Sequence, residues 1–122
     1  MISQNHMKKY MAVFLGAATA EEMEKWKARP DREEIEKKGM AAWNKWGTDN
    51  AGAIIDNGSP LGKTKQVDKS GVKDTRNEMA AWTIVQAESH EEAARLFENH
   101  PHFTIFPGDR VEIMECLPMP TS

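Results

Sequence analysis

The chain has a single cysteine, Cys116, among its 122 residues. One cysteine excludes an internal disulfide and is typical of a reducing compartment. Because Cys116 falls in a predicted strand, we expect a small buried hydrophobic residue rather than a reactive thiol. These observations predict a cytoplasmic protein.

The chain also lacks an excess of positive charge and any long hydrophobic run. Its 16 basic and 19 acidic residues are interspersed and give a net charge of −3. No basic stripe is present of the kind that nucleic-acid backbones require. No apolar stretch is long enough to span a bilayer. We therefore expect neither nucleic acid nor a membrane as a partner.

The amino-terminal region has two interpretations. Lys8-Lys9, the apolar run that follows and Ala18-Thr19-Ala20 resemble the parts of a secretory signal. Residues Lys9 to Leu15 also fit a first β-strand. We favour the strand, because Thr19 and Glu22 form a capping box that begins a helix at once.

The domain organisation follows from length and pattern. At 122 residues the chain has room for one domain with one core. Residues 1–7 show no pattern, so we expect a disordered tail. Residues 8–120 then form a single domain.

Two helices are predicted after the first strand. The first runs from Thr19 to about Ala28. The second begins at Asp31, which forms a capping box with Glu34, and Gly47 and Asn50 signal its end. One face of this helix repeats at steps of four and three, with the residues Ile35, Gly39, Ala42, Trp43 and Trp46. Glycine within a helix is unfavourable, so Gly39 is predicted to mark a close packing contact.

A short strand and a polar hairpin are predicted next. Ala53 to Asp56 reads as a strand that ends at the turn pair Asn57-Gly58. Gly58 to Gly62 reads as a rigid bend, and Lys63 to Asp68 as an exposed strand. Lys69-Ser70-Gly71 then turns the chain back.

The last third of the chain repeats the order strand, helix, strand. Met79 to Ala87 is apolar at both its odd-numbered and its even-numbered positions, so a strand there has no face suited to water. Ser89 to His100 is an amphipathic pattern that Pro101 is expected to stop. Arg110 to Cys116 reads as the final strand.

This order predicts an α+β fold of the ferredoxin-like type, β-α-β-β-α-β, with an antiparallel sheet and helices on one face. Tyr10, Ala12 and Phe14 alternate with further apolar residues, so the sheet would expose an apolar patch on its uncovered face. A second copy stacked sheet to sheet would cover the patch. We therefore expect a homodimer that forms a dimeric α+β barrel.

Candidate binding residues come from both layers of this fold. Trp43, Trp46 and Trp82 supply flat apolar walls for a substrate pocket, although tryptophans above a sheet are also common core residues. Ser59 lies in the bend beside them. Asp56, at the end of a strand, is the carboxylate that we expect to act as a general base.

The histidines admit several roles. His100 and His102 flank Pro101 and, in an extended segment, would project to one side, where they could contact a ligand or a metal. We take His102 as the second catalytic candidate and His100 as a pocket residue. His100 could instead interact as a partial cation with the end of the preceding helix. A third ligand at short spacing is lacking, so no metal site is predicted.

Gly58 to Thr64 imitates a phosphate-binding loop. The spacing is one residue short, Pro60 removes an amide that would contact phosphate, and a strand follows instead of a helix. We therefore predict no nucleotide site and no cofactor.

Several segments together resemble the YCII-related proteins, including the DGPF-type branch of the dimeric α+β barrel superfamily. The resemblance covers residues 8–120 and rests on Gly58–Gly62, the strand through Trp82, His100-Pro101-His102-Phe103 and Gly108–Met114. It implies a dimeric barrel with a cleft between sheet and helices. The chain differs from some of these relatives in two respects. It has no histidine between Glu21 and Trp46, and Val72–Thr75 stands where a DGPF tetrapeptide is expected.

Two functions are consistent with these patterns. The first is a homodimer that binds a small organic molecule in the cleft and carries out cofactor-free acid–base or oxygenation chemistry. The alternative is a non-catalytic dimeric module that senses a metabolite or docks on a partner protein.

Overall fold

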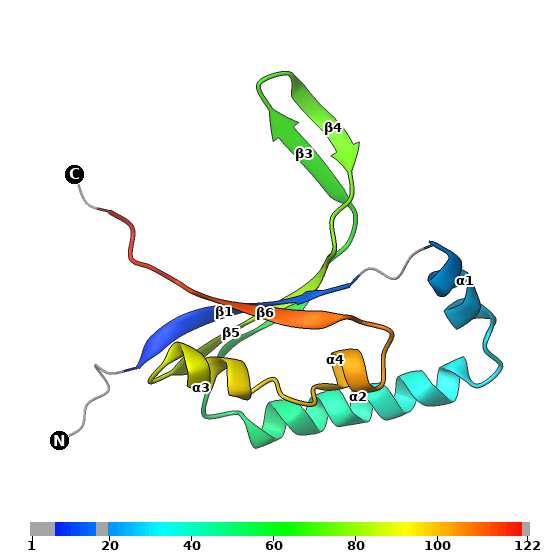
Figure 1. Cartoon of the computed structure of the whole chain (residues 1–122), viewed down its shortest axis with the longest axis horizontal. Coiled ribbons are helices and arrows are strands. Elements are labelled where there is room, and N and C mark those ends of the chain that lie inside the picture. The colour runs from blue at the N-terminus through cyan, green and yellow to red at the C-terminus, as the bar shows by residue number, and fades with distance from the viewer. Residues whose placement is uncertain (1–6, 17–19, 121–122) are drawn as a thin grey trace.

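A computed structural model describes residues 7–16 and 20–120 of the chain (Figure 1). Its elements follow the predicted order of strand, two helices, strand, hairpin, strand, helical segment and strand. In chain order they are β1 (Lys8–Leu15), α1 (Ala20–Ala28), α2 (Arg32–Asp49), β2 (Ile54–Pro60), β3 (Thr64–Asp68), β4 (Gly71–Thr75), β5 (Met79–Ala87), α3 (His90–Arg95), α4 (Pro101–Thr104) and β6 (Arg110–Glu115).

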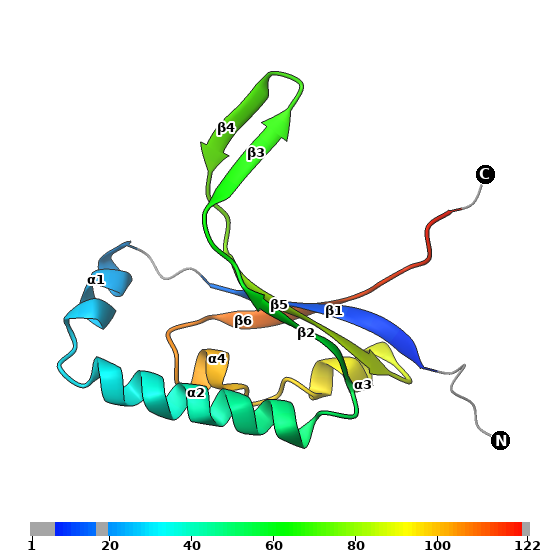
Figure 2. The same ribbon diagram turned by 180° about the vertical axis from the view of Figure 1, so that it is seen from behind.

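The main sheet has four strands in the order β2-β5-β1-β6, and every neighbouring pair is antiparallel. The helices α2, α3 and α4 lie on one side of it (Figures 1 and 2). The first strand β1 and the strand β5 therefore form the centre of the sheet, and the last strand β6 lies at an edge beside β1 although the two are far apart in the sequence. This is the ferredoxin-like arrangement, and the predicted α+β fold class is confirmed.

The face of the sheet beneath the helices holds the core. Tyr10, Ala12 and Phe14 on β1 pair with Val85, Thr83 and Ala81 on β5. Alternation along the strands places these side chains on one face. The buried members of the core are Tyr10, Ala12, Phe14, Val85, Ala87, Ala93 and Phe97.

The opposite face carries no helix. Met11 lies between Ile84 and Met114, and Val13 lies between Trp82 and Glu112. We call this surface the open face. Val13 is buried there, whereas the other apolar side chains among these residues are half-buried or exposed, as the two-sided apolar pattern of β1 and β5 predicts.

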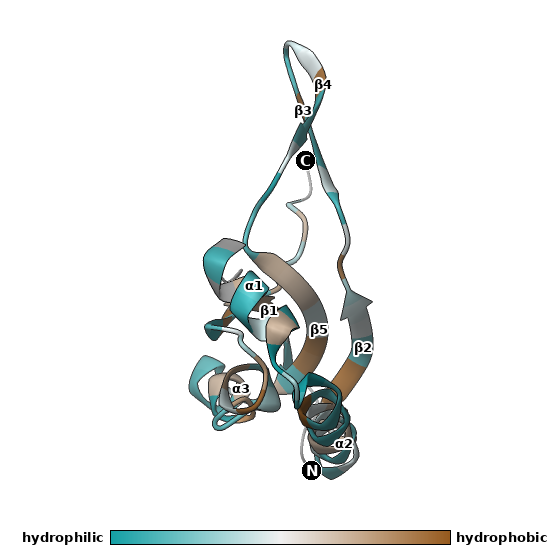
Figure 3. Ribbon diagram, turned by 90° about the vertical axis from the view of Figure 1, so that its right-hand side faces the viewer, coloured by the Kyte–Doolittle hydropathy of each residue, from teal (hydrophilic) through white to brown (hydrophobic). Residues whose placement is uncertain are grey.

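The hairpin β3–β4 stands apart from the main sheet and points away from the helices (Figures 1 and 3). Val67 and Val72 pair across it and are 74% and 66% exposed. The predicted polar hairpin is confirmed, and its outer end carries an apolar pair that nothing in the described chain covers.

Gly39 is a contact point between α2 and the segment after α4. A Cβ atom added to Gly39 would lie 2.5 Å from Cε2 of Phe106. The close packing predicted from Gly39 is therefore confirmed. The indole Nε1 of Trp46 donates a 2.7 Å hydrogen bond to the carbonyl of Leu96, which fixes the other end of the helix.

The helix predicted from Ser89 to His100 is wrong in extent. Ser89 caps α3 by accepting a hydrogen bond from the Glu92 amide, but the helix ends at Arg95. Asn99 takes a left-handed conformation with φ of 58°, and His100 is extended. A residue before proline avoids the helical region, and proline suits the first helical position. Pro101 therefore begins α4 instead of only ending α3.

The turn predicted at Asn57-Gly58 is also wrong, because β2 continues through both residues to Pro60. The register with β5 shifts between Ile54 and Asp56 and again between Asp56 and Ser59, the interval that contains this pair. Gly58 has a φ of 66°, and a Cβ atom there would overlap the carbonyl of Trp82. The residues that suggest a turn instead form an irregularity within a strand.

Three smaller predictions need correction. Asp31 makes no capping hydrogen bond to α2, and its carboxylate pairs with Arg29 at 3.0 Å. Gly47 does not end α2, which continues to Asp49 with Asn50 as its cap. Cys116 is exposed, because β6 ends one residue before it.

Two predicted features lie outside the described residues. Thr19 of the first capping box is one, and residues 1–6 of the expected tail are the other. Within the described chain no helix is both long and apolar enough to cross a membrane.

The glycines of α2 give a matched test of the core. Gly39→Ala should destabilise the protein by about 1–3 kcal/mol, because the added methyl group displaces the ring of Phe106. Gly47→Ala should stabilise it by roughly 0.5–1 kcal/mol, since nothing lies within 4 Å of its Cβ position. Urea unfolding of both variants measures the two effects. Equal changes in both would show that helix propensity alone decides them.

Candidate functional site

His100 lies at the centre of an aromatic cluster between α2 and the sheet. The side chain is fully buried. Ring centroids of its neighbours lie 4.5 Å away for Trp43, 4.8 Å for Trp46, 5.0 Å for Phe14 and 6.0 Å for Phe97. Burial, with a smaller contribution from nearby His102, lowers the pKa of His100 to about 4. His100 is therefore neutral at pH 7, and its predicted role as a partial cation at a helix end is wrong.

The hydrogen bond of His100 sets its tautomer. Its Nδ1 accepts the backbone N–H of His102 at 3.0 Å, so the proton of the neutral ring is on Nε2. This bond is also the N-cap of α4. The Nε2 atom has no partner and is the one such buried side-chain nitrogen or oxygen in the described chain. His100 thus positions the first turn of α4, and with it His102.

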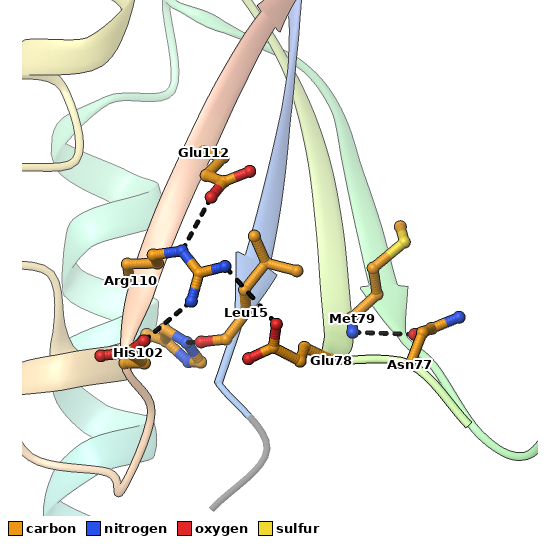
Figure 4. A network of polar contacts seen from close by, with 8 residues as sticks. Leu15, Asn77, Glu78, Met79, His102, Arg110 and Glu112 are labelled. Carbon is orange, nitrogen blue, oxygen red and sulfur yellow. Dashed lines mark hydrogen bonds and ion pairs between the residues drawn. The ribbon is translucent and has the colours of Figure 1, made fainter.

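His102 is held by the sheet through its ring nitrogen Nε2. Its Nε2 lies 2.8 Å from the carbonyl of Leu15, at the end of β1 (Figure 4). A carbonyl only accepts, so Nε2 carries the proton and Nδ1 keeps a lone pair. Gly108 packs against the ring, since a Cβ atom there would lie 2.2 Å from Cε1. The ring is fixed in place and in tautomer.

The Nδ1 atom of His102 has no hydrogen-bond partner within the described residues and is not completely buried. The residue as a whole is only 6% exposed. An imidazole nitrogen that is held in one orientation and keeps a free lone pair is well suited to accept a proton.

The cavity beside His102 lies between α2 and the strands β2 and β5. Its volume is about 350 Å³ and its surface is mostly apolar. Helix α2 supplies Met40 and Trp43 on one side, and Phe106 lies on another. The complete lining is Met40, Trp43, Asn57, Gly58, Ser59, Pro60, Ala80, Ala81, Trp82, Thr83, His102 and Phe106. We call this space the first cavity.

A second cavity adjoins the first at His102. Its volume is about 300 Å³, and it shares Ala80, His102 and Phe106 with the first cavity. Met23 of α1 and Arg76 of the β4–β5 connection lie in its wall. Arg76 also lines a wider hollow of about 820 Å³ at the base of the hairpin, among mostly polar residues and without any aromatic residue or histidine. This hollow therefore offers less to an organic ligand.

The structure brings four of the predicted site residues together. Trp43, Ser59, Trp82 and His102 all line the first cavity. Trp82 belongs to β5, where it pairs with Ser59 of β2 beside the cavity.

The other predicted site residues lie elsewhere. Trp46 and His100 belong to the aromatic cluster behind the cavity wall. Asp56 does not line the cavity. Its side chain is exposed, and its Oδ1 accepts the Gly58 amide at 2.9 Å.

The sequence analysis missed Met40, Arg76, Phe106 and Gly108. The four lie in three separate segments, and only the fold brings them to His102. Gly39 was the one sequence feature that pointed towards Phe106. A glycine within a helix indicates that a group from elsewhere in the chain occupies the space of the missing side chain.

An ion network anchors the strand end that holds His102. Arg110 pairs with Glu112 at 2.7 Å, Asp109 at 2.8 Å and Glu78 at 3.6 Å (Figure 4). The hydrogen bonds that Arg110 donates to these carboxylates, to Glu112 first, raise the pKa of Arg110. Because Arg110 also pairs with Leu15 in the sheet register, the network surrounds the carbonyl that orients His102.

Comparison with known proteins gives a likeness in structure alone. No family model and no curated protein matches the chain. A solved structure, 5-chloro-2-hydroxyhydroquinone dehydrochlorinase from Burkholderia phenoliruptrix in complex with 2,5-dihydroxybenzoquinone, superposes with a TM-score of 0.50. It is 17% identical, and the match covers 86% of this chain and 89% of that one. This likeness agrees with the fold class. The resemblance to YCII-related proteins stays a prediction.

The lowered pKa of His100 predicts acid-sensitive stability. An unfolded histidine has a pKa of about 6.5, so between pH 6.5 and 4 the unfolded chain binds more protons than the folded protein. The contribution of neutral His100 to the free energy of unfolding is therefore fully present above about pH 6.5 and is lost as the pH falls towards 4. From the size of the shift we expect a loss on the order of 3 kcal/mol. Urea unfolding at pH 7 and pH 4.5 measures it.

His100→Phe and His90→Gln are the test and control variants for this prediction. The loss between the two pH values should shrink in His100→Phe, which cannot titrate. It should persist in His90→Gln, because His90 is exposed. An unchanged loss in His100→Phe would assign the acid sensitivity to carboxylates instead.

Proposed function

We propose that the protein binds a small planar organic molecule in the first cavity and that His102 transfers a proton within it. The observation that carries this proposal is that His102 lines the first cavity with its Nδ1 unpaired and its Nε2–H fixed on the Leu15 carbonyl. Trp43 and Phe106 provide flat apolar surfaces for such a molecule. No cofactor is needed for this chemistry.

The proposed reaction needs no second reactant, because the proton is taken from the ligand and returned to it. The Nδ1 lone pair of His102 takes a proton from an acidic C–H or O–H group, which leaves the electron pair on the ligand. The imidazolium that forms keeps its Nε2–H bond to the Leu15 carbonyl, and that bond is stronger when the donor is charged. Return of the proton to another atom of the ligand completes an isomerisation. The acid–base role is assigned to His102 rather than to Asp56, which bonds to its own strand.

The rival proposal is a non-catalytic binding module. It is favoured by the small number of ionisable groups, because His102 is the one titratable side chain among the lining residues of the first cavity. Catalysis of a proton transfer needs no second group if the same histidine returns the proton. Binding and turnover must therefore be measured separately.

2-Tetralone is a suitable probe, since it is planar in its aromatic part and has exchangeable α-protons. Proton exchange in D₂O, followed by NMR, should be accelerated by the protein. His102→Gln keeps an N–H donor for the Leu15 carbonyl but has no basic nitrogen. We expect it to bind the probe with similar affinity and to lose about 10²–10⁴-fold in exchange rate.

The matched control is His90→Gln. His90 also makes a hydrogen bond to a backbone carbonyl, that of Ile113 at 2.7 Å, but it does not line the cavity. Its exchange rate should equal that of the unchanged protein. Binding of 2-tetralone or 2,5-dihydroxybenzoquinone without any accelerated exchange would favour the binding module. Failure to bind either compound would overturn the proposal.

We also propose a homodimer in which the open faces of two copies meet. Met11, Ile84 and Met114 form its exposed apolar part, which water tolerates poorly. The hairpin β3–β4 points to the same side (Figure 1), and an isolated two-stranded hairpin is marginally stable in water. A second copy on the open face would give the hairpin a surface to pack against.

Ile84→Glu tests the dimer. A charge on the open face should convert a dimer into a monomer, which light scattering detects as a halving of the mass. Phe103→Glu is the control, because Phe103 is similarly apolar and exposed but belongs to the helix layer. A monomeric unchanged protein would contradict the proposed assembly and leave the cavity proposal intact.

A further inference from the structure

We infer that the ligand of the His102 site carries an acidic group, which Arg76 binds in the second cavity. This inference rests on the proposed function and adds the chemical class of the ligand. Its basis is the charge distribution around His102. The first cavity is lined by no permanently charged side chain, and the second by one, Arg76.

The carboxylates nearest to Arg76 in the sequence have other partners. Asp74 pairs with Lys65 at 2.6 Å, and Glu78 pairs with Arg110 at 3.6 Å. No ion pair or side-chain hydrogen bond of Arg76 exists with the side chains that the structure describes. An arginine beside two engaged carboxylates retains its five N–H donors for a ligand.

The position of Arg76 relative to His102 defines the binding mode. Both residues line the second cavity, and His102 also lines the first. A molecule whose ring contacts Trp43 in the first cavity and whose reacting atom meets His102 would present its far substituent to the second cavity. A carboxylate there can form two parallel hydrogen bonds with the guanidinium of Arg76.

The other side chains around Arg76 are mostly apolar. Met23, Phe106 and Pro107 lie in the wall of the second cavity with Arg76. Arg76 itself is exposed, so water binds its guanidinium in the free protein. A neutral amide of the same shape would bring it no opposite charge, whereas a carboxylate would. The site should therefore select acids over their amides.

2-Naphthoate and 2-naphthamide test the inference, because they differ in charge and hardly in shape. Titrations followed by NMR should give at least about 10-fold tighter binding of the acid, as expected for a charge-assisted hydrogen bond. Arg76→Gln should remove the preference and leave the affinity for the amide unchanged. Arg76→Lys should keep part of the preference.

Arg95→Gln is the control for net charge. Arg95 is an exposed arginine of α3 that lines neither cavity, so this variant should keep the full preference. Equal affinity of the unchanged protein for both probes would overturn the role of Arg76 alone. Loss of the preference in Arg95→Gln would do the same, since a long-range field would then explain it. Failure of both probes to bind would overturn the proposed function as well.

Discussion

The burial of the neutral His100 imidazole among aromatic rings is the constraint on which the rest of the site depends. Desolvation keeps the ring uncharged, so its Nδ1 is available as an acceptor for the amide of His102. That bond begins α4 directly after an extended residue. Without it, Pro101 would end a helix instead of starting one, and His102 would have no fixed position above the sheet.

A chain of contacts then connects the core to the cavity. His100 places His102, the Leu15 carbonyl fixes its proton on Nε2, and Gly108 leaves room for the ring. Each contact is made by backbone or by a buried side chain, so the geometry does not depend on mobile surface groups. This is the arrangement that a positioned base requires, because a loosely held imidazole would not keep one tautomer.

The two faces of the sheet have different roles. The covered face supplies the core and the cavity, whereas the open face supplies an apolar surface beside the Arg110 ion network. Charges at one end of the open face and apolar side chains at the other would fix the orientation of a second sheet, because unpaired charges oppose any other alignment. The hairpin lies beyond this surface and contributes nothing to the core.

The sequence by itself determined the order of the elements, the ferredoxin-like fold class and the close contact at Gly39. Periodicity and glycine placement are local properties, and the chain records them directly. The tertiary structure alone decided that His102 meets Leu15, that Arg76 shares its cavity and that Asp56 does not. These relations join segments far apart in the chain, and they depend on how β1 and α4 pack. Local rules also failed where tertiary contacts outweighed them: Gly58 is held in a strand by Trp82, and Pro101 begins a helix because His100 caps it.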